Sequence, residues 1–159
     1  ARTAGVVLRL QRHDALQEAV PDRLFDDVLL DAPCSGTGTW GRAPDARWRL
    51  SPEAVVRFAR QQAALLRQAA RAVKPGGILV YATCALTDAE NGDQLAAFLA
   101  ETPEFEPAPF RHPLTGDMTP GQAYLWPWQG PGTGLFAARL RRRRAHREKL
   151  EFRDIGPVE

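Results

Sequence analysis

Two cysteines, Cys34 and Cys84, are the residues of this sequence best suited to nucleophilic chemistry. A deprotonated thiol is a strong nucleophile and can form covalent intermediates. With no nearby histidine or acidic ligand set, the two thiols do not indicate a zinc site. Without secretory features in the sequence, free thiols are expected rather than a disulfide. A single cysteine is more often a small buried apolar residue than a catalyst, so the elements that position the thiols decide between these interpretations.

Each cysteine follows an apolar run. Residues 25–30 (FDDVLL) and 78–82 (ILVYA) have the pattern of strands buried on both faces of a parallel sheet, and residues 5–10 (GVVLRL) predict another strand. In open α/β sheets, ligands bind outside the carboxyl ends of the strands. The candidate residues at or just after such ends are Asp14, Asp31, Cys34 and Cys84. If the strands before the cysteines are neighbours, about 4.8 Å apart, both thiols would face one cleft.

Helices are expected between and after these strands. Ser51-Pro52-Glu53 is a typical helix start, and Lys74-Pro75-Gly76-Gly77 stops that helix. Thr87 and Glu90 form a capping-box pattern for a second helix. The remaining segments are an irregular loop over 102–122 and closing strands over 124–128 and 135–140, joined by the loop 129–134. This order predicts an α/β fold whose sheet is mostly parallel with an antiparallel edge.

Composition is that of an ordinary soluble globular protein, with 159 residues, 44% hydrophobic and 25% charged. No run approaches the ~18 apolar residues of a membrane span, and no signal-peptide pattern is present, so a cytoplasmic location is expected. The net charge is only +2, but basic residues gather near the end of the chain: Arg139, Arg141, Arg142, Arg143, Arg144, His146, Arg147 and Lys149. Such a run either binds phosphates or forms a solvated tail, and the sequence leaves both open.

Two longer stretches carry a family resemblance. DAPCSGTGTWGRAPDARW (31–48) and PGGILVYATCALTDAEN (75–91) closely resemble the NOL/NOP/Sun family of RNA 5-methylcytosine methyltransferases. That family has a Pro-Cys and a Thr-Cys motif at the ends of adjacent strands, matched here by Pro33-Cys34 and Thr83-Cys84. GTGLFAARL (132–140) also looks like the family's final strand. The resemblance implies a Rossmann-like methyltransferase sheet, S-adenosylmethionine as cofactor, and RNA (rRNA or tRNA) as substrate, with no metal.

The resemblance also assigns the thiols. Carbon 5 of cytosine is a poor nucleophile until a thiolate adds to carbon 6, which makes carbon 5 able to attack a sulfonium methyl group. By resemblance, Cys84 is the attacking nucleophile and Cys34 assists product release. Enzymes that make 5-methylcytosine in DNA resemble this chain in using a Pro-Cys cysteine as nucleophile, which would favour Cys34. The additional Thr83-Cys84 motif favours Cys84 and RNA.

Acidic residues near the thiols have competing interpretations. By resemblance, Asp31 hydrogen-bonds the cytosine ring, and Asp14, Asp31 and Pro33 contact the cofactor. Asp31 alone could instead hydrogen-bond the backbone of the following turn, and Asp14 could cap the segment after it. Glu90 and Asn91 match a family pair, but helix capping explains Glu90 without a catalytic role, and we prefer that interpretation.

Substrate contacts are expected on a loop and on the tail. Arg42 and Trp48 lie in a segment that resembles the family's substrate side, where an arginine and an aromatic ring meet phosphate and a splayed base. Arg141 and Arg142 are further candidates for RNA contact. Trp126 and Trp128 are interpreted as packing or edge-strand residues rather than as stacking platforms.

The glycine-rich cofactor turn and the first strands of such an enzyme are not visible before Gly5. We therefore expect residues 1–140 to be the C-terminal part of a methyltransferase domain, and 141–159 a basic tail. A second hypothesis is a non-catalytic remnant that binds RNA or a partner, and a third is a DNA cytosine-5 methyltransferase. The sequence leaves the oligomeric state open.

Overall fold

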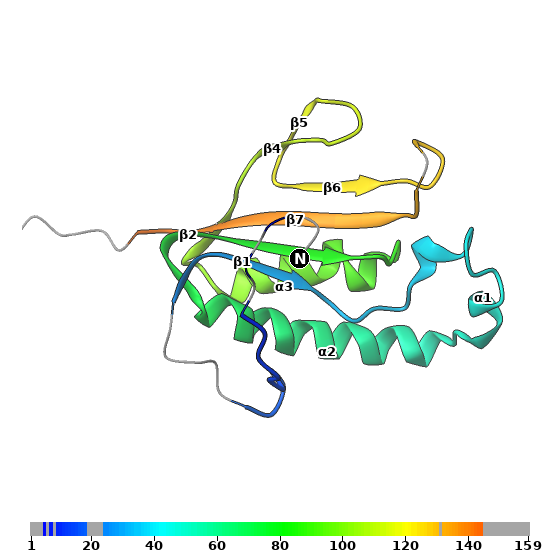
Figure 1. Ribbon diagram of the computed structural model, residues 1–159, viewed down its shortest axis with the longest axis horizontal. Coiled ribbons are helices and arrows are strands. Elements are labelled where there is room, and N and C mark those ends of the chain that lie inside the picture. Colours follow the sequence, from blue (N-terminus) through cyan, green and yellow to red (C-terminus); the bar gives the residue numbers. More distant parts are fainter. Residues whose placement is uncertain (1–4, 6, 8, 19–23, 131, 145–159) are drawn as a thin grey trace, which may run out of the picture.

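The computed structural model describes residues 5, 7, 9–18, 24–130 and 132–144 (Figure 1). Its two longer helices are α2 (Pro52–Arg71) and α3 (Gly92–Glu101), preceded by the short helix α1 (Ala46–Arg49). Single 3-10 turns are η2 (Thr37–Thr39) and η3 (Asp88–Glu90). The strands are β1 (Phe25–Asp31), β2 (Val73–Thr83), β3 (Phe105–Pro107), β4 (Phe110–Arg111), β5 (Met118–Thr119), β6 (Gln122–Leu125) and β7 (Leu135–Arg142).

The main sheet has the order β1-β2-β7-β3, and β6 also pairs with β7. Only β1 and β2 run parallel, whereas β2, β3 and β6 all pair antiparallel with β7. The prediction of a mostly parallel sheet is therefore wrong for the described residues. A parallel pair needs a long crossover, which α2 provides between β1 and β2, whereas the loop between β6 and β7 reverses the chain and gives an antiparallel pair.

Helix α2 confirms the sequence prediction closely. Ser51 is its N-cap, and the Ser51 hydroxyl accepts a hydrogen bond from the Ala54 N–H, with Pro52 at the first helical position. Both α2 and α3 lie on one side of the sheet (Figure 1). This single helical layer sets the position of the core.

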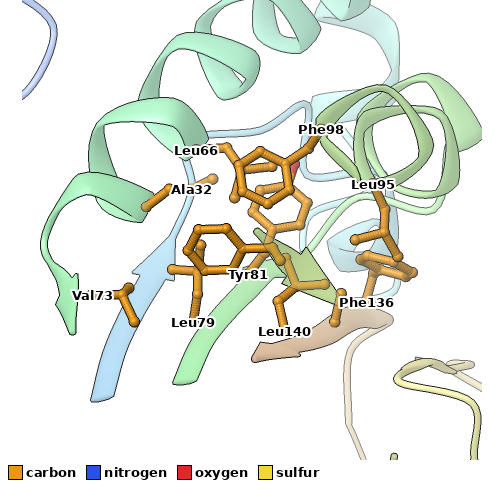
Figure 2. Close-up of a cluster of buried hydrophobic side chains, with 12 residues drawn as sticks. Ala32, Leu66, Val73, Leu79, Tyr81, Leu95, Phe98, Phe136 and Leu140 are labelled. Atoms are coloured by element: carbon orange, nitrogen blue, oxygen red, sulfur yellow. The ribbon is translucent and has the colours of Figure 1, made fainter. Parts of the chain in front are cut away.

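The core lies between that helical layer and the sheet (Figure 2). Leu79 and Tyr81 of β2 and Phe136 and Leu140 of β7 are fully buried and meet Leu66 of α2. Buried positions alternate along β2 with half-buried ones, so the prediction of strands buried on both faces is wrong. On β1, Val28 and Leu30 pack against the core, whereas Leu29, on the opposite face of the strand, is 69% exposed.

Two further expectations fail for physical reasons. Residues 5, 7, 9 and 10 form no strand, and residues 6 and 8 lie outside the described part of the chain. Val7 is 98% exposed, so its apolar side chain has nothing to pack against. Residues 102–122, expected as an irregular loop, contain β3, β4 and β5. β3 pairs with the distant β7, which local patterns do not reveal, whereas β4 and β5 pair with each other over only two residues each.

Candidate active site

The two thiols meet at the carboxyl ends of the parallel pair. Asp31 and Ala82 are partners in the β1–β2 register, and the Ala32 N–H donates to the Ala82 carbonyl at 2.9 Å just beyond it. The chains then continue to Cys34 and Cys84, whose sulfur atoms are 3.2 Å apart. Both residues are half-buried free thiols, and the sulfur separation exceeds the roughly 2.05 Å of a disulfide. The prediction that strand pairing brings both thiols to one place is confirmed.

Burial keeps the thiol of Cys34 protonated. Loss of solvent, followed by the hydrogen bond with Cys84, raises the pKa of Cys34 to about 12. The neutral form of Cys34 therefore predominates throughout the physiological range. A neutral Cys34 thiol can donate its hydrogen to the Cys84 sulfur.

Slow alkylation of Cys34 follows from its raised pKa. Because the thiolate is the reactive species, at about pH 8.5 Cys34 should react with iodoacetamide on the order of 100-fold more slowly than a cysteine in an unfolded peptide. Peptide mapping by mass spectrometry after timed labelling measures this rate, and the same protein in denaturant is the control. A Cys34 labelling rate equal to that of the denatured chain would contradict the assignment.

A buried carboxylate holds the Cys34 loop. Both oxygens of the fully buried Glu90 side chain accept hydrogen bonds from Ser35: Oε1 from the backbone N–H at 2.8 Å and Oε2 from the hydroxyl at 2.5 Å. The Thr87 hydroxyl also donates to Oε2 at 2.8 Å. The preferred interpretation of Glu90 as a helix cap is wrong, because α3 begins later, at Gly92, and the carboxylate reaches across the chain to Ser35. This role was not predicted from the sequence, and the only signal for it was that Glu90 and Asn91 match a residue pair of the family.

Helix α2 supports the same loop through Gln62. The Gln62 Nε2 group, fully buried, donates to the Pro33 carbonyl at 2.9 Å and to Glu90 Oε1 at 3.1 Å. Gln62 therefore ties both the residue before Cys34 and its carboxylate partner to the helix. Nothing in the helical pattern distinguished Gln62 from an ordinary helix residue.

Asn91 fixes the other thiol. Its side-chain oxygen accepts from the Thr83 hydroxyl at 2.6 Å, and its Nδ2 group donates to the Ala85 carbonyl at 2.9 Å. These two bonds hold the residues on either side of Cys84. Glu90 and Asn91, adjacent in sequence, thus position one cysteine each.

A close backbone crossing completes the thiol site. The Gly38 N–H donates to the Cys84 carbonyl at 2.8 Å, and the Gly134 N–H donates to the Gly38 carbonyl at 2.8 Å. A Cβ atom at Gly38 would lie 2.5 Å from the Gly134 oxygen, so only glycine fits there. The crossing joins the start of β7 to both cysteine segments.

The predicted cofactor residues share one depression. Asp14, Asp31 and Pro33 line an open hollow of about 960 Å³, together with Gln61 and Leu65. The carboxylates and apolar side chains in this lining suit a ligand that carries a positive charge and an apolar ring, so the residues fit S-adenosylmethionine. Asp31 lies between this depression and the cysteine segment.

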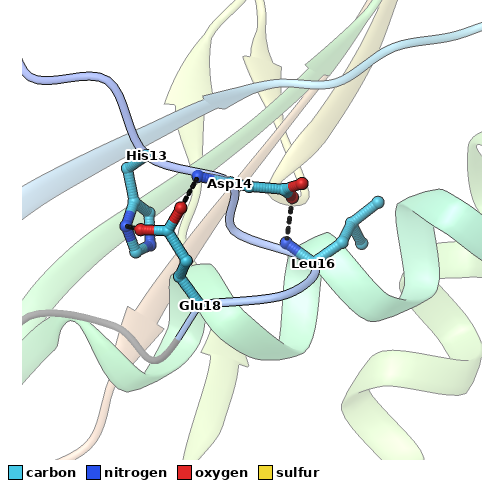
Figure 3. Close-up of polar contacts among 4 residues, drawn as sticks. All are labelled: His13, Asp14, Leu16 and Glu18. Carbon is cyan, nitrogen blue, oxygen red and sulfur yellow. Dashed lines mark hydrogen bonds and ion pairs between the residues drawn. The ribbon is translucent and has the colours of Figure 1, made fainter.

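Asp14 also shapes its own turn (Figure 3). Its carboxylate accepts from the Leu16 N–H at 3.0 Å, and the Asp14 carbonyl accepts from the Glu18 N–H at 2.8 Å. The Glu18 carboxylate accepts in return from the Asp14 N–H at 3.2 Å. The capping interpretation of Asp14 is therefore confirmed, and the same turn presents the residue to the depression.

The predicted substrate residues are divided between two ends of the sheet. Arg42 and Trp48 are exposed on the segment that follows the cysteine loop, and the Arg47 guanidinium lies over the Trp48 ring at 4.3 Å. Arg141 pairs with Ile78 in the sheet, five residues before Thr83, which places it about 17 Å from the thiol end. Arg142 donates to the Val73 carbonyl at 2.6 Å. The structure therefore does not bring Arg141 and Arg142 close to the thiols. Residues 145–159 of the predicted tail lie outside the described residues.

The described residues contain neither a metal-binding cluster nor a membrane-spanning helix. No group of three or more His, Cys, Asp or Glu side chains in that part of the chain is placed to hold a metal ion. None of its helices combines the length and the apolar character needed to cross a membrane.

Fold and site together define a class: an α/β domain with two free thiols at the carboxyl ends of a parallel strand pair, beside a carboxylate-lined depression. The profile of the family described as 16S rRNA methyltransferase RsmB/F matches residues 4–141. The chain therefore belongs to this family, and the NOL/NOP/Sun resemblance is confirmed.

Individual relatives agree with this assignment. The chain is 43% identical over 142 residues to "Ribosomal RNA small subunit methyltransferase B" of Thermus thermophilus, covering 89% of this chain and 35% of that protein. It is 38% identical over 141 residues to the probable counterpart in Synechocystis, covering 85% and 32%. The chain thus spans about a third of the length of these curated relatives.

Solved structures show the same fold. The crystal structure of NSun6 from Pyrococcus horikoshii with SFG superposes with a TM-score of 0.68 at 26% identity, covering 84% of this chain and 34% of that one. A methyltransferase homolog protein from the same organism gives a TM-score of 0.61 at 27% identity, covering 76% and 40%.

Proposed function

We propose that the protein transfers a methyl group from S-adenosylmethionine to carbon 5 of a cytosine in ribosomal RNA. The observation that carries this proposal is the pair of sulfur atoms 3.2 Å apart beside the depression that Asp14 and Asp31 line. The relatives are named as ribosomal RNA small subunit methyltransferases, which favours rRNA over tRNA. We propose that the sheet is part of a Rossmann-like methyltransferase sheet, which the part of those relatives that this chain does not span would complete. The proposed location is the cytoplasm.

Cys84 is the proposed nucleophile. Its thiolate adds to carbon 6 of the cytosine, forming a sulfur–carbon bond and moving the electron pair of the 5,6 double bond toward the ring carbonyl. The cofactor, when bound, would supply an electrophilic methyl group to carbon 5, and its sulfonium–methyl bond would break so that the sulfur leaves as a neutral thioether. Asp31, which ends β1 and lines the depression, is proposed to hydrogen-bond the ring and favour this addition.

Cys34 is proposed to act on the thiolate of Cys84. After methylation, the proton on carbon 5 passes to water, the 5,6 double bond re-forms, and the sulfur of Cys84 leaves as a thiolate. The protonated Cys34 thiol, 3.2 Å away, can donate a hydrogen bond to that leaving sulfur. Cys34 would thus assist product release, while Glu90 and Gln62 hold it in position as positioning residues.

Cofactor binding is proposed for Asp14, Asp31 and Pro33, which line one depression. A family relative was solved with SFG, an analogue of S-adenosylmethionine. The exposed Arg42 and Trp48 remain proposed RNA contacts, while Arg141 and Arg142 would contact RNA only at the far end of the sheet.

Nucleoside analysis tests the proposed function directly. The protein, expressed with all the sequence that its gene encodes, is incubated with unmodified 16S rRNA and S-adenosylmethionine, and the digested RNA is analysed for 5-methylcytidine by mass spectrometry. We expect 5-methylcytidine only when the cofactor is present. Modification of DNA in preference to RNA would favour a DNA methyltransferase. Salt-sensitive RNA binding with no methylation would favour a non-catalytic binding protein.

A further inference from the structure

Three aromatic rings form a continuous stack on the surface after β6. The Tyr124 and Trp126 rings are 4.9 Å apart at an interplanar angle of 13°, and the Trp126 and Trp128 rings are 5.0 Å apart at 10°. Tyr124 also packs at 4.8 Å against Phe136, which is fully buried. The stack therefore begins at the core and ends at Trp128, which is 76% exposed.

The backbone holds the last ring in place. Alternate residues of an extended chain point to the same side, which aligns Tyr124 with Trp126. Beyond them the chain turns: the Gln129 N–H donates to the Trp126 carbonyl at 3.0 Å, and the Gln129 side-chain oxygen accepts from the Trp126 N–H at 2.9 Å. Pro127, at the second position of this turn, restricts it further. The turn and the stacking contact with Trp126 thus position the Trp128 ring, although most of its surface meets solvent.

The stack lies at the thiol end of the sheet. Tyr124 is paired with Phe136, and Phe136 with Thr83, the residue before Cys84. The chain from Trp128 back to β7 passes through Gly134, whose N–H donates to Gly38 next to the Cys84 carbonyl. Figure 1 shows the β6–β7 connection on the same side of the molecule as η2 and α1, which follow β1. Beside Trp126 lies a shallow pocket of about 200 Å³ with Leu114 and Leu125 in its wall.

We propose that Trp128 is a stacking platform for an unpaired RNA base next to the target cytosine. The proposal rests on the proposed function, since a cytosine attacked at carbon 6 must leave its helical stack, which deprives a neighbouring base of its partner. An exposed indole face that continues an ordered stack replaces such a partner for any base, because every base has a π face. Trp128 was interpreted from the sequence as a packing residue, and this describes only the face that stacks on Trp126.

Fluorescence of 2-aminopurine tests the platform, because this base loses emission when it stacks. The probe is a short single-stranded oligoribonucleotide with one cytosine and 2-aminopurine beside it. We expect the probe to be quenched by the protein and by Trp128→Phe, which keeps an aromatic face. Trp128→Leu should lose the quenching and bind about five- to 150-fold more weakly. Val56→Ala, on the exposed side of α2, is the control, and circular dichroism checks the fold of each variant.

Several results would overturn the proposal. The proposal is wrong if Trp128→Leu binds the probe within about twofold as tightly as the parent protein does. It is also wrong if Trp128→Leu binds more weakly but still quenches the 2-aminopurine fully. A change in self-association of Trp128→Leu without any change in RNA binding would assign the ring to a protein contact instead. The proposed function fails separately: if the parent protein forms no covalent complex with 5-fluorocytosine RNA, the chemistry is wrong whatever the quenching shows.

Discussion

Replacing Cys84 with alanine is expected to abolish methyl transfer, lowering the rate by about 10⁴-fold or more, as loss of a covalent nucleophile does in other enzymes. No other sulfur can take its place, because Cys34 is held protonated by its raised pKa of about 12. Cys34→Ala is expected to behave differently. Addition to the base and methylation should proceed, while release slows, so that a covalent protein–RNA complex accumulates on denaturing gels.

The two variants control for one another. Both remove one half-buried sulfur from the same contact, so equal losses of activity with no accumulated complex would contradict separate roles. If Cys34→Ala lost activity and Cys84→Ala accumulated the complex, the two roles would be reversed.

Glu90→Ala is expected to have the largest effect on stability. It removes both acceptors of the Ser35 N–H and hydroxyl, leaves the half-buried Thr87 hydroxyl without its acceptor, and leaves the buried Gln62 Nε2 group with only the Pro33 carbonyl. Unsatisfied buried donors of this kind should lower the free energy of unfolding by about 3–4 kcal/mol, measured by chemical denaturation. Because Ser35 follows Cys34 directly, the loop should also move, and Cys34 should become alkylated faster.

Glu90→Gln is the matched variant. Two N–H groups reach Oε1, and two hydroxyls reach Oε2. A glutamine with its oxygen at the Oε1 position keeps the first pair, and the hydroxyls can rotate to accept from its NH₂ group. We expect a loss of only about 1 kcal/mol. If Gln and Ala destabilised the protein equally, the hydrogen bonds of Glu90 would not explain its effect.

The thiol site was predictable because its parts are local. An apolar run followed by Pro-Cys or Thr-Cys places each thiol at a strand end, and a helix between the runs makes parallel neighbours of the strands. These features follow from residues close together in sequence. The contact between Cys34 and Cys84 then requires only that the two strands pair.

Glu90 and Gln62 were not predictable in the same way. Glu90 has a local pattern, Thr87-x-x-Glu90, that suggests a helix cap, but its main partner Ser35 is 55 residues away. The local pattern predicted a helix cap, but the hydrogen bond with the distant Ser35 determines where the Glu90 side chain lies. The strand expected at residues 5–10 shows the reverse case: an apolar pattern permits a strand, but strand formation also requires a neighbour with which to pair.

Trapping the intermediate tests the central proposal most directly. RNA that contains 5-fluorocytosine blocks proton loss from carbon 5, so the enzyme–base bond persists when the protein is incubated with this RNA and S-adenosylmethionine. Peptide mapping by mass spectrometry then identifies the attached residue. We predict an adduct on Cys84 that includes the transferred methyl group and is absent from Cys84→Ala. An adduct on Cys34, or none with a folded protein and 16S rRNA sequences, would contradict the proposed mechanism.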